Sequence, residues 1–314
     1  MTRLLAVLAV IAMLAVAGCG GDDNGGGGGG ATGASSSSDQ PGKGKPALTM
    51  GTKDFTEEFI LGNLYAQALE AKGYKVNLKE NIGATEITDK ALTSGKIDAY
   101  PEYTGETTAT VFGKNKLYKS AEETANDAKA LYEERGQVVS NPTPFEDVDA
   151  IATTKEFAQK NGLSGVPDLK KLGSFTLGAR PEFKSRFVGL KGMEQVYGIK
   201  NAKFTQLALG LQYKALDRGD VDTANVFSTD AQLASGKYTV LKDPQGVFGF
   251  QNILFVINKD KYEALGGPTF MAIIDAVNKL LTAEAMRSMN SAVDIDKKDP
   301  AEVAKAFLDA NKMT

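Results

Sequence analysis

Histidine and tryptophan are absent from the 314 residues, and there is a single cysteine. Without histidine, Ser–His and Cys–His nucleophiles and His-based acid–base catalysis are excluded, and most zinc sites lose their usual ligand. One cysteine excludes an internal disulfide, which needs two. The formal net charge is −3 and the two signs are interspersed, so no basic stripe indicates nucleic-acid binding. We therefore expect neither a cofactor nor a metal.

Long apolar runs are also scarce, and the one that exists lies at the N-terminus. Arg3 precedes the apolar run Leu4 to Val16, which is shorter than the about 20 residues that a bilayer span needs. This pattern predicts a signal peptide over residues 1–18. The order Leu14 to Cys19 resembles a bacterial lipobox, which implies that Cys19 becomes the lipidated N-terminus. The alternative is an ordinary signal peptide that happens to contain a cysteine.

Residues 19–46 consist largely of Gly, Ser, Asp and Asn. Such a segment cannot bury enough apolar surface to offset the entropy of ordering. It predicts a disordered tether that lets the folded part reach away from a membrane.

Strand-like and helix-like segments alternate in the rest of the chain, which favours an α/β fold with largely parallel sheets. The first strand is expected at 48–52. A helix follows, with Asp54 and Glu57 in the pattern of a capping box, and Gly73 marks its end. A strand at 75–79, a helix at 85–94 and a strand at 97–100 come next.

The chain contains an internal sequence repeat, which we call the internal echo. Residues 90–98 are matched by 214–222, and 49–55 by 176–183. At the same offset Tyr103 falls opposite Phe227. Chance similarity between common strand–helix patterns is the alternative, but the shared order argues against it.

Two similar α/β units predict two facing lobes. Ligands bind beyond the carboxyl ends of parallel strands, and four echoed side chains lie just past such ends. We therefore expect Lys53, Tyr103, Arg180 and Phe227 to converge on one cleft. The domain expectation is lobe I over 47–148, lobe II over 149–246, and a return to lobe I over 247–314.

Such a cleft suits a zwitterion with a bulky cationic head. Aromatic faces attract quaternary ammonium groups at about 0.5–2 kcal/mol each, and Lys53 or Arg180 could hold a carboxylate. Ordinary structural roles compete with this interpretation: core packing for the two rings and a solvated turn for Lys53. Asp147 and Asp149 are either solvated acids or cleft residues that attract the cation.

Four segments then carry a family resemblance: Gly51 to Glu58, Tyr100 to Gly105, Arg180 to Phe183 with Arg186, and Phe227 to Asp230. They resemble motifs of the glycine betaine/carnitine/choline substrate-binding proteins of ABC importers. The resemblance covers nearly all of the chain from Leu48 onward. It implies a two-lobed periplasmic-binding-protein fold of type II, with the ligand cleft between the lobes.

The resemblance also implies site residues. An aromatic cage would map onto Tyr103, Phe227 and Phe250, and carboxylate contacts onto Lys53 with Arg186 or Arg180. Thr229, in the fourth motif, is a further expected contact.

The sequence departs from the family at Asp149, where a cage tyrosine is usual. The ligand therefore stays open among glycine betaine, choline, carnitine, ergothioneine and an amine.

The resulting hypothesis is a lipid-anchored, extracytoplasmic and monomeric binding protein. It would deliver a quaternary-ammonium solute to a permease and an ATPase, with the anchor as its only membrane contact. A sensor or adhesion lipoprotein of the same fold is one alternative. Another is a lipid-anchored hydrolase that uses Glu102 with Glu106, or Asp147 with Asp149. The missing histidine and the lack of a G-x-S-x-G motif argue against the hydrolase.

Overall fold

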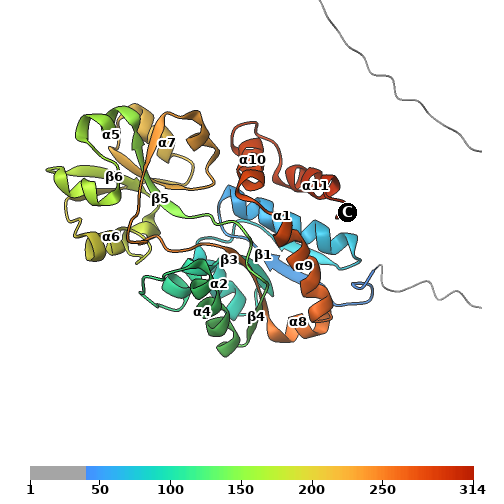
Figure 1. Ribbon diagram of the computed structural model, residues 1–314. Helices are drawn as coiled ribbons and strands as arrows, with labels where there is room; N and C mark the ends of the chain where they lie inside the picture. Colours follow the sequence, from blue (N-terminus) through green and yellow to red (C-terminus); the bar gives the residue numbers. More distant parts are fainter. Residues whose placement is uncertain (1–39) are drawn as a thin grey trace, which may run out of the picture. The chain divides into compact units, whose positions relative to one another are not determined.

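The computed structural model describes residues 40–314, which form two five-stranded sheets flanked by helices (Figure 1). The predictions for Cys19, the signal peptide and residues 19–39 lie outside the described residues. Residues 40–46, the last part of the expected tether, are among the described residues. Residues 41–44 form a turn in which the Gly42 N–H donates to the Lys72 carbonyl over 2.9 Å. This contact joins the segment to the end of the first helix.

The first sheet has the strand order β2-β1-β3-β10-β4. Its strands are β1 (Leu48–Gly51), β2 (Val76–Lys79), β3 (Ala99–Tyr103), β4 (Gln137–Val139) and β10 (Ile253–Asn258). Strand β1 pairs in parallel with β2 and β3, whereas β10 runs antiparallel to β3 and β4. We call this sheet and its helices lobe I.

The second sheet has the order β7-β6-β8-β5-β9 and repeats the same pattern of directions. Its strands are β5 (Asp149–Thr154), β6 (Phe175–Ala179), β7 (Ala202–Gln206), β8 (Thr223–Phe227) and β9 (Tyr238–Leu241). Strand β6 is parallel to β7 and β8, whereas β5 is antiparallel to β8 and β9. We call this half lobe II.

Both sheets are mixed, but four strands of each run in one direction and a single strand runs against them, so the expectation of mostly parallel sheets is confirmed. The chain passes from the first sheet to the second between β4 and β5, and it returns between β9 and β10. Each arriving strand enters its new sheet from the side where the parallel strands end. Strands β5 and β10 must consequently run against the strands beside them.

Helices cover both faces of the first sheet. Alternate residues of β10 point to opposite faces, as in any strand: Phe255 joins the core beneath α1, whereas Leu254 joins the core beneath α2 and α4. The lobe I helices are α1 (Thr56–Ala71), α2 (Thr85–Thr93), α3 (Thr104–Glu106) with the π-helix η1 (Thr107–Val111), α4 (Ala121–Glu134), α8 (Lys259–Leu265), α9 (Pro268–Leu280), α10 (Ala283–Asp294) and α11 (Pro300–Ala310).

Lobe II contains shorter helices. They are α5 (Lys155–Asn161), η2 (Val166–Lys171), η3 (Pro181–Lys184), α6 (Leu190–Tyr197), α7 (Gln212–Arg218) and η4 (Ala231–Ser235). None of the helices within residues 40–314 has both the length and the apolar character needed to cross a membrane.

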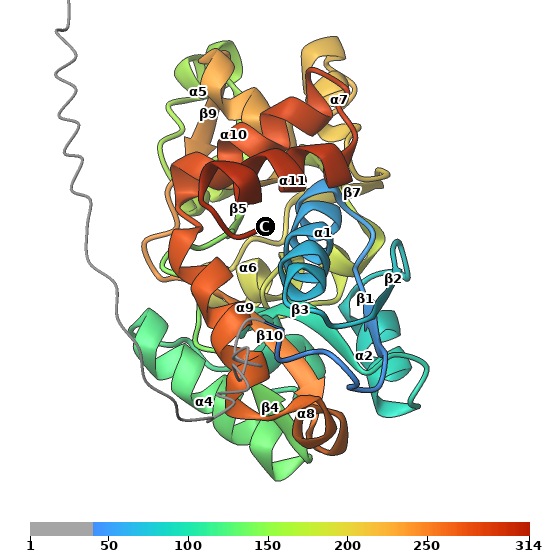
Figure 2. The same ribbon diagram turned by 90° about the vertical axis from the view of Figure 1, so that its right-hand side faces the viewer.

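Helix α1 is buried between the first sheet and the C-terminal helices α9, α10 and α11 (Figure 2). Apolar residues surround it rather than forming one stripe, as expected for a helix packed on several sides. It begins at Thr56 with Phe55 as N-cap and no side-chain cap, so the expected Asp54–Glu57 capping box is wrong. Residues 54 and 55 instead belong to the turn that follows β1.

The internal echo is visible in the hydrogen bonds. Asp98 Oδ2 accepts the backbone N–H of Thr49 over 2.8 Å, and Asp222 Oδ2 accepts that of Thr176 over 2.7 Å. In each lobe, the acid that follows a helix–glycine turn thus fixes the start of the first parallel strand. The repeated residues therefore make the same contact in both lobes.

The two crossing segments lie against each other between the lobes. Glu146 and Asn252 form an isolated antiparallel bridge, and the Asp147 N–H donates to the Gln251 carbonyl over 3.1 Å. Residues on this pair of segments therefore lie where the two lobes meet.

Candidate functional site

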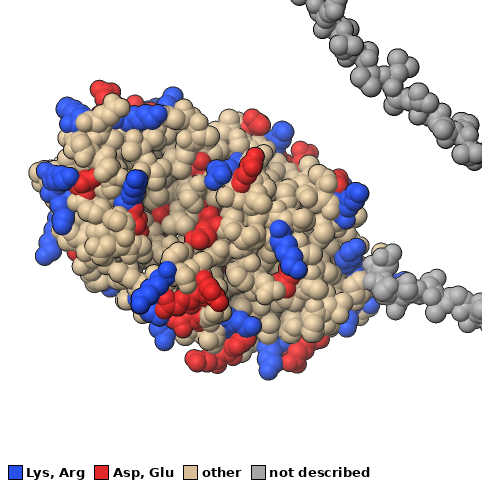
Figure 3. Space-filling model, in the orientation of Figure 1, with Lys and Arg blue, Asp and Glu red and all other residues tan. Residues whose placement is uncertain are grey.

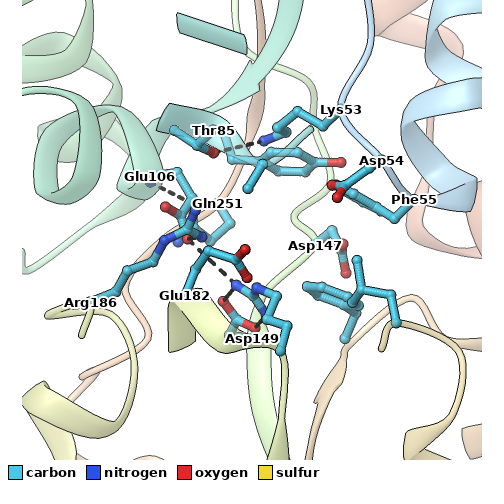
Figure 4. Close-up of a pocket in the computed structure, with 15 residues that line it drawn as sticks. Lys53, Asp54, Phe55, Thr85, Glu106, Asp147, Asp149, Glu182, Arg186 and Gln251 are labelled. Atoms are coloured by element: carbon cyan, nitrogen blue, oxygen red, sulfur yellow. Dashed lines mark hydrogen bonds and ion pairs between the residues drawn. The ribbon is translucent and has the colours of Figure 1, made fainter. Parts of the chain in front are cut away.

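A pocket of about 500 Å³ lies at the strand ends where the two lobes and the crossings meet (Figure 4). Lobe I, lobe II and the crossing segments all contribute residues. The lining comprises Lys53, Asp54, Phe55, Ala84, Thr85, Tyr103, Glu106, Asp147, Asp149, Arg180, Glu182, Arg186, Leu209, Phe227 and Gln251. Five of these side chains are acidic and three are basic, and the excess of acids makes the pocket attractive to cations. Figure 3 shows Asp and Glu residues within the hollow between the lobes.

Three aromatic rings form one wall of the pocket. Phe55 stacks on Phe227 with ring centroids 5.4 Å apart and an interplanar angle of 12°. Its centroid lies 6.1 Å from that of Tyr103, with the rings tilted by 31°. The echoed residues Tyr103 and Phe227 thus both lie beside Phe55. Aromatic side chains from both lobes contribute to a single surface.

Lys53 lies at the lobe I side of this wall. Its ammonium nitrogen is 2.5 Å from Glu102 Oε1 and 4.2 Å from the centroid of the Tyr103 ring. Glu58 Oε1 is farther away, at 3.9 Å, and is buried with no hydrogen-bond partner among residues 40–314. Burial raises the pKa of Glu58 to about 8 and also raises the pKa of Glu102. Because one ammonium cannot neutralise two buried carboxylates, Lys53 pairs with Glu102 and Glu58 is protonated at neutral pH.

Arg180 occupies the matching place in lobe II. It donates from Nη1 to Asp149 Oδ1 over 2.6 Å and from Nη2 to Asp149 Oδ2 over 2.8 Å. Asn225 accepts a further bond from Arg180 and donates to Asp149. Burial alone would raise the pKa of Asp149, but Arg180 and Asn225 lower it below its ordinary value. Asp149 is therefore an ionised partner of Arg180.

Arg186 links two acids at the lobe I side of the pocket. It donates from Nη2 to Glu86 Oε2 over 2.7 Å and from Nη1 to Glu106 Oε1 over 3.1 Å. The backbone N–H groups of Gly105 and Glu106 both donate to Gln251 Oε1. A Cβ at Gly105 would lie 2.6 Å from Gln251 Nε2, so glycine is needed for this contact. Gln251 thus fixes the backbone that presents Glu106.

A second hollow, of about 880 Å³, lies on the other side of Phe55 and Phe227. The Thr229 hydroxyl is 2.7 Å from both Glu57 Oε2 and Asp147 Oδ1. A hydroxyl can donate only one proton, so one of the two acids must be protonated and donate to it. Burial raises the pKa of Glu57 to about 6, and burial together with the Glu57 charge raises that of Asp147 well above its ordinary value.

Seven of the nine expected ligand contacts line the first pocket: Lys53, Tyr103, Asp147, Asp149, Arg180, Arg186 and Phe227. Thr229 lines the second hollow instead. Phe250 is half-buried and is in neither lining. Its carbonyl accepts from the Thr104 hydroxyl over 2.8 Å, which holds the second crossing against α3.

Phe55 was not among the expected pocket residues, and Glu106 was expected only as a suspected hydrolase acid. Phe55 lies within the quoted Gly51 to Glu58 motif, directly after Lys53 and Asp54, so its place past a strand end could have revealed it. Glu106 directly follows the Tyr100 to Gly105 motif. Among residues 40–314, no group of three or more His, Cys, Asp and Glu residues could hold a metal.

Two α/β lobes, joined by two adjacent crossings with a pocket at the strand ends, define the two-lobed fold of periplasmic binding proteins. Residues 46–310 match the family described as the substrate-binding domain of the ABC-type glycine betaine transport system. The chain belongs to this family.

Several characterised relatives resemble the chain. A glycine-betaine-binding protein of Pseudomonas aeruginosa is 33% identical over 273 residues, covering 83% of this chain and 86% of the relative. The glycine betaine-binding protein YehZ of Escherichia coli is 28% identical, covering 85% and 92%.

Solved structures agree on the fold. Apo YehZ from Escherichia coli superimposes with a TM-score of 0.62 at 28% identity and covers 85% of this chain and 99% of its own. A glycine betaine/carnitine/choline ABC transporter structure has a TM-score of 0.68 at 24% identity, with the same coverages.

Proposed function

We propose that this protein is the extracytoplasmic substrate-binding protein of an ABC importer and captures a quaternary-ammonium solute. The observation that carries the proposal is the aromatic surface of Phe55, Tyr103 and Phe227 in a pocket with more acids than bases. Rings attract cations through their quadrupoles, and the attraction grows when water is excluded. Membership of the family and the names of the relatives support the same solute class.

The proposal includes the way the solute is held. Lobe I contributes Phe55 and Tyr103 and lobe II contributes Phe227, so the lobes would have to part to admit the solute and come together again around it, which desolvates the cation. Lys53, Asp147, Asp149, Arg180 and Arg186 surround the cage, and Thr229 supports Asp147 from behind.

We also propose that Cys19 carries a lipid anchor after removal of residues 1–18, and that residues 19–39 act as the tether. The protein then works as a monomer with a permease and an ATPase and catalyses no reaction. Mass spectrometry of the mature N-terminus checks the anchor: an unmodified Cys19 in the exported protein would contradict it.

Calorimetric titration with choline, glycine betaine and carnitine tests solute binding. Replacing Phe227 with leucine should weaken the binding of any solute that binds by about 3- to 30-fold, because it removes one cation–π contact. Phe204→Leu is the matched control, because Phe204 is a partly buried phenylalanine of β7 outside the pocket lining. Equal weakening in the two variants, or no binding of any quaternary ammonium, would refute the proposal.

A further inference from the structure

The bases of the pocket already have partners within the protein. Arg180 forms its two-pronged contact with Asp149, Arg186 bridges Glu86 and Glu106, and Lys53 pairs with Glu102. The family resemblance assigns these same bases to a solute carboxylate. At Arg180 such a carboxylate would compete with Asp149, a buried acid that is already in bidentate contact, and a displaced Asp149 would be buried without its partner.

One acid in the pocket lining, unlike these paired bases, has an oxygen without a partner among residues 40–314. Glu106 is 6% exposed and uses only Oε1, which accepts from Arg186 over 3.1 Å. Its other oxygen, Oε2, is buried and accepts no hydrogen bond from residues 40–314. Buried polar atoms are nearly always hydrogen-bonded. A lining carboxylate with a vacant acceptor is a place for a donor supplied by a ligand.

We infer that the solute carries a hydrogen-bond donor, a hydroxyl or an amine, at the end opposite its cationic head, and that it carries no carboxylate. The donor bonds to Glu106 Oε2 while the head contacts the aromatic wall. This inference rests on the proposed function and narrows it from quaternary ammonium compounds in general to cationic alcohols and amines. A carboxylate in the same place would face Glu106 with like charge.

Three probes separate the inference from the proposed function. Choline, glycine betaine and tetramethylammonium share a quaternary head, but the first adds a hydroxyl, the second a carboxylate and the third neither. Calorimetry on the purified protein should show choline binding about 10- to 100-fold more tightly than tetramethylammonium, which is the range for a hydrogen bond to a charged group. Glycine betaine should bind more weakly than choline.

The outcomes are distinct. If glycine betaine binds as tightly as choline or more tightly, the inference is wrong and the proposed function stands. If none of the three binds, both fail.

Glu106→Gln tests the residue itself. The amide can turn its N–H₂ toward the position of Oε2, so a donor replaces an acceptor at similar size. The preference for choline over glycine betaine should fall about tenfold or more. Glu86→Gln is the matched control, because Glu86 binds the same arginine from a half-exposed position outside the pocket lining.

An unchanged preference in a folded Glu106→Gln protein would overturn the inference. An equal change in both variants would overturn it too, because the effect would then pass through Arg186. Thermal unfolding confirms that each variant folds. Glu106→Asp, which keeps the charge but draws the carboxylate oxygens back from the pocket, should weaken choline binding by a larger factor than tetramethylammonium binding.

Discussion

The buried carboxyl of Glu58 makes the stability of the protein depend on pH in a direction opposite to that of a salt-bridged acid. Its ordinary pKa of 4.5 rises to about 8 in the folded protein, chiefly because burial disfavours the charged form. Between these values the folded state binds more protons than the unfolded state. Stability therefore falls as pH rises through this window.

The magnitude follows from the same two values. At about 1.4 kcal/mol per pH unit, the ionised side chain costs the folded state about 5 kcal/mol at high pH. The cost is only about 1.4 kcal/mol at pH 5.5, where the unfolded chain has already lost most of this proton. The contribution should thus change by about 3 kcal/mol between pH 5.5 and pH 9.

Glu58→Gln removes this titration and keeps an oxygen that can accept the Lys53 backbone N–H, now 3.0 Å from Oε2. Urea unfolding at pH 5.5, 7 and 9 measures the effect. The stability of the variant relative to wild type should rise by about 3 kcal/mol across this range. Glu134→Gln, at the exposed end of α4, is the control and should show no such rise. Parallel pH profiles for wild type and Glu58→Gln would show that Lys53 keeps Glu58 ionised, and the reasoning would fail.

Two further predictions concern other contacts. Thr229→Val removes the hydroxyl between Glu57 and Asp147 at constant size and should lower the free energy of unfolding at pH 7 by about 1.5–3 kcal/mol. Urea unfolding measures this loss. An unchanged urea midpoint would mean that the hydroxyl contact with the two acids makes no net contribution to stability. Gly192→Ala would put a Cβ 1.9 Å from a backbone carbonyl oxygen and should cost about 1–3 kcal/mol, whereas Gly173→Ala meets nothing within 4 Å and should be neutral. Similar melting temperatures for the two alanine variants would contradict this.

Much of the framework could be predicted because it depends on local patterns and on the internal echo. The repeated strand–glycine–base and helix–glycine–strand patterns correspond to β1 and β6, and to α2–β3 and α7–β8. The equivalent bonds of Asp98 and Asp222 show why those positions are repeated. Strand direction could not be predicted in the same way, because β5 and β10 take their direction from the lobe that they leave.

The pairing of charges in the pocket could not be predicted from the sequence. Lys53 and Glu102 are 49 residues apart, and Arg180 and Asp149 are 31 apart. Burial and geometry decide which acid each base meets. Asp149 illustrates the difficulty. An acid in place of a cage tyrosine suggests direct attraction of a solute cation, whereas in the structure both of its carboxylate oxygens accept hydrogen bonds from Arg180.

The echo places a base against an aromatic ring in both lobes, and this has a consequence for affinity. The Lys53 ammonium lies 4.2 Å from the centre of the Tyr103 ring, and the Arg180 guanidinium carbon lies 5.1 Å from that of Phe227. A solute cation that approaches these rings therefore competes with cations of the protein. A lysine ammonium is compact and strongly hydrated, whereas a quaternary head has no N–H group and loses less on leaving water. The exchange should thus favour quaternary over primary ammonium heads, because the displaced lysine recovers the same hydration in either case and the quaternary head gives up less.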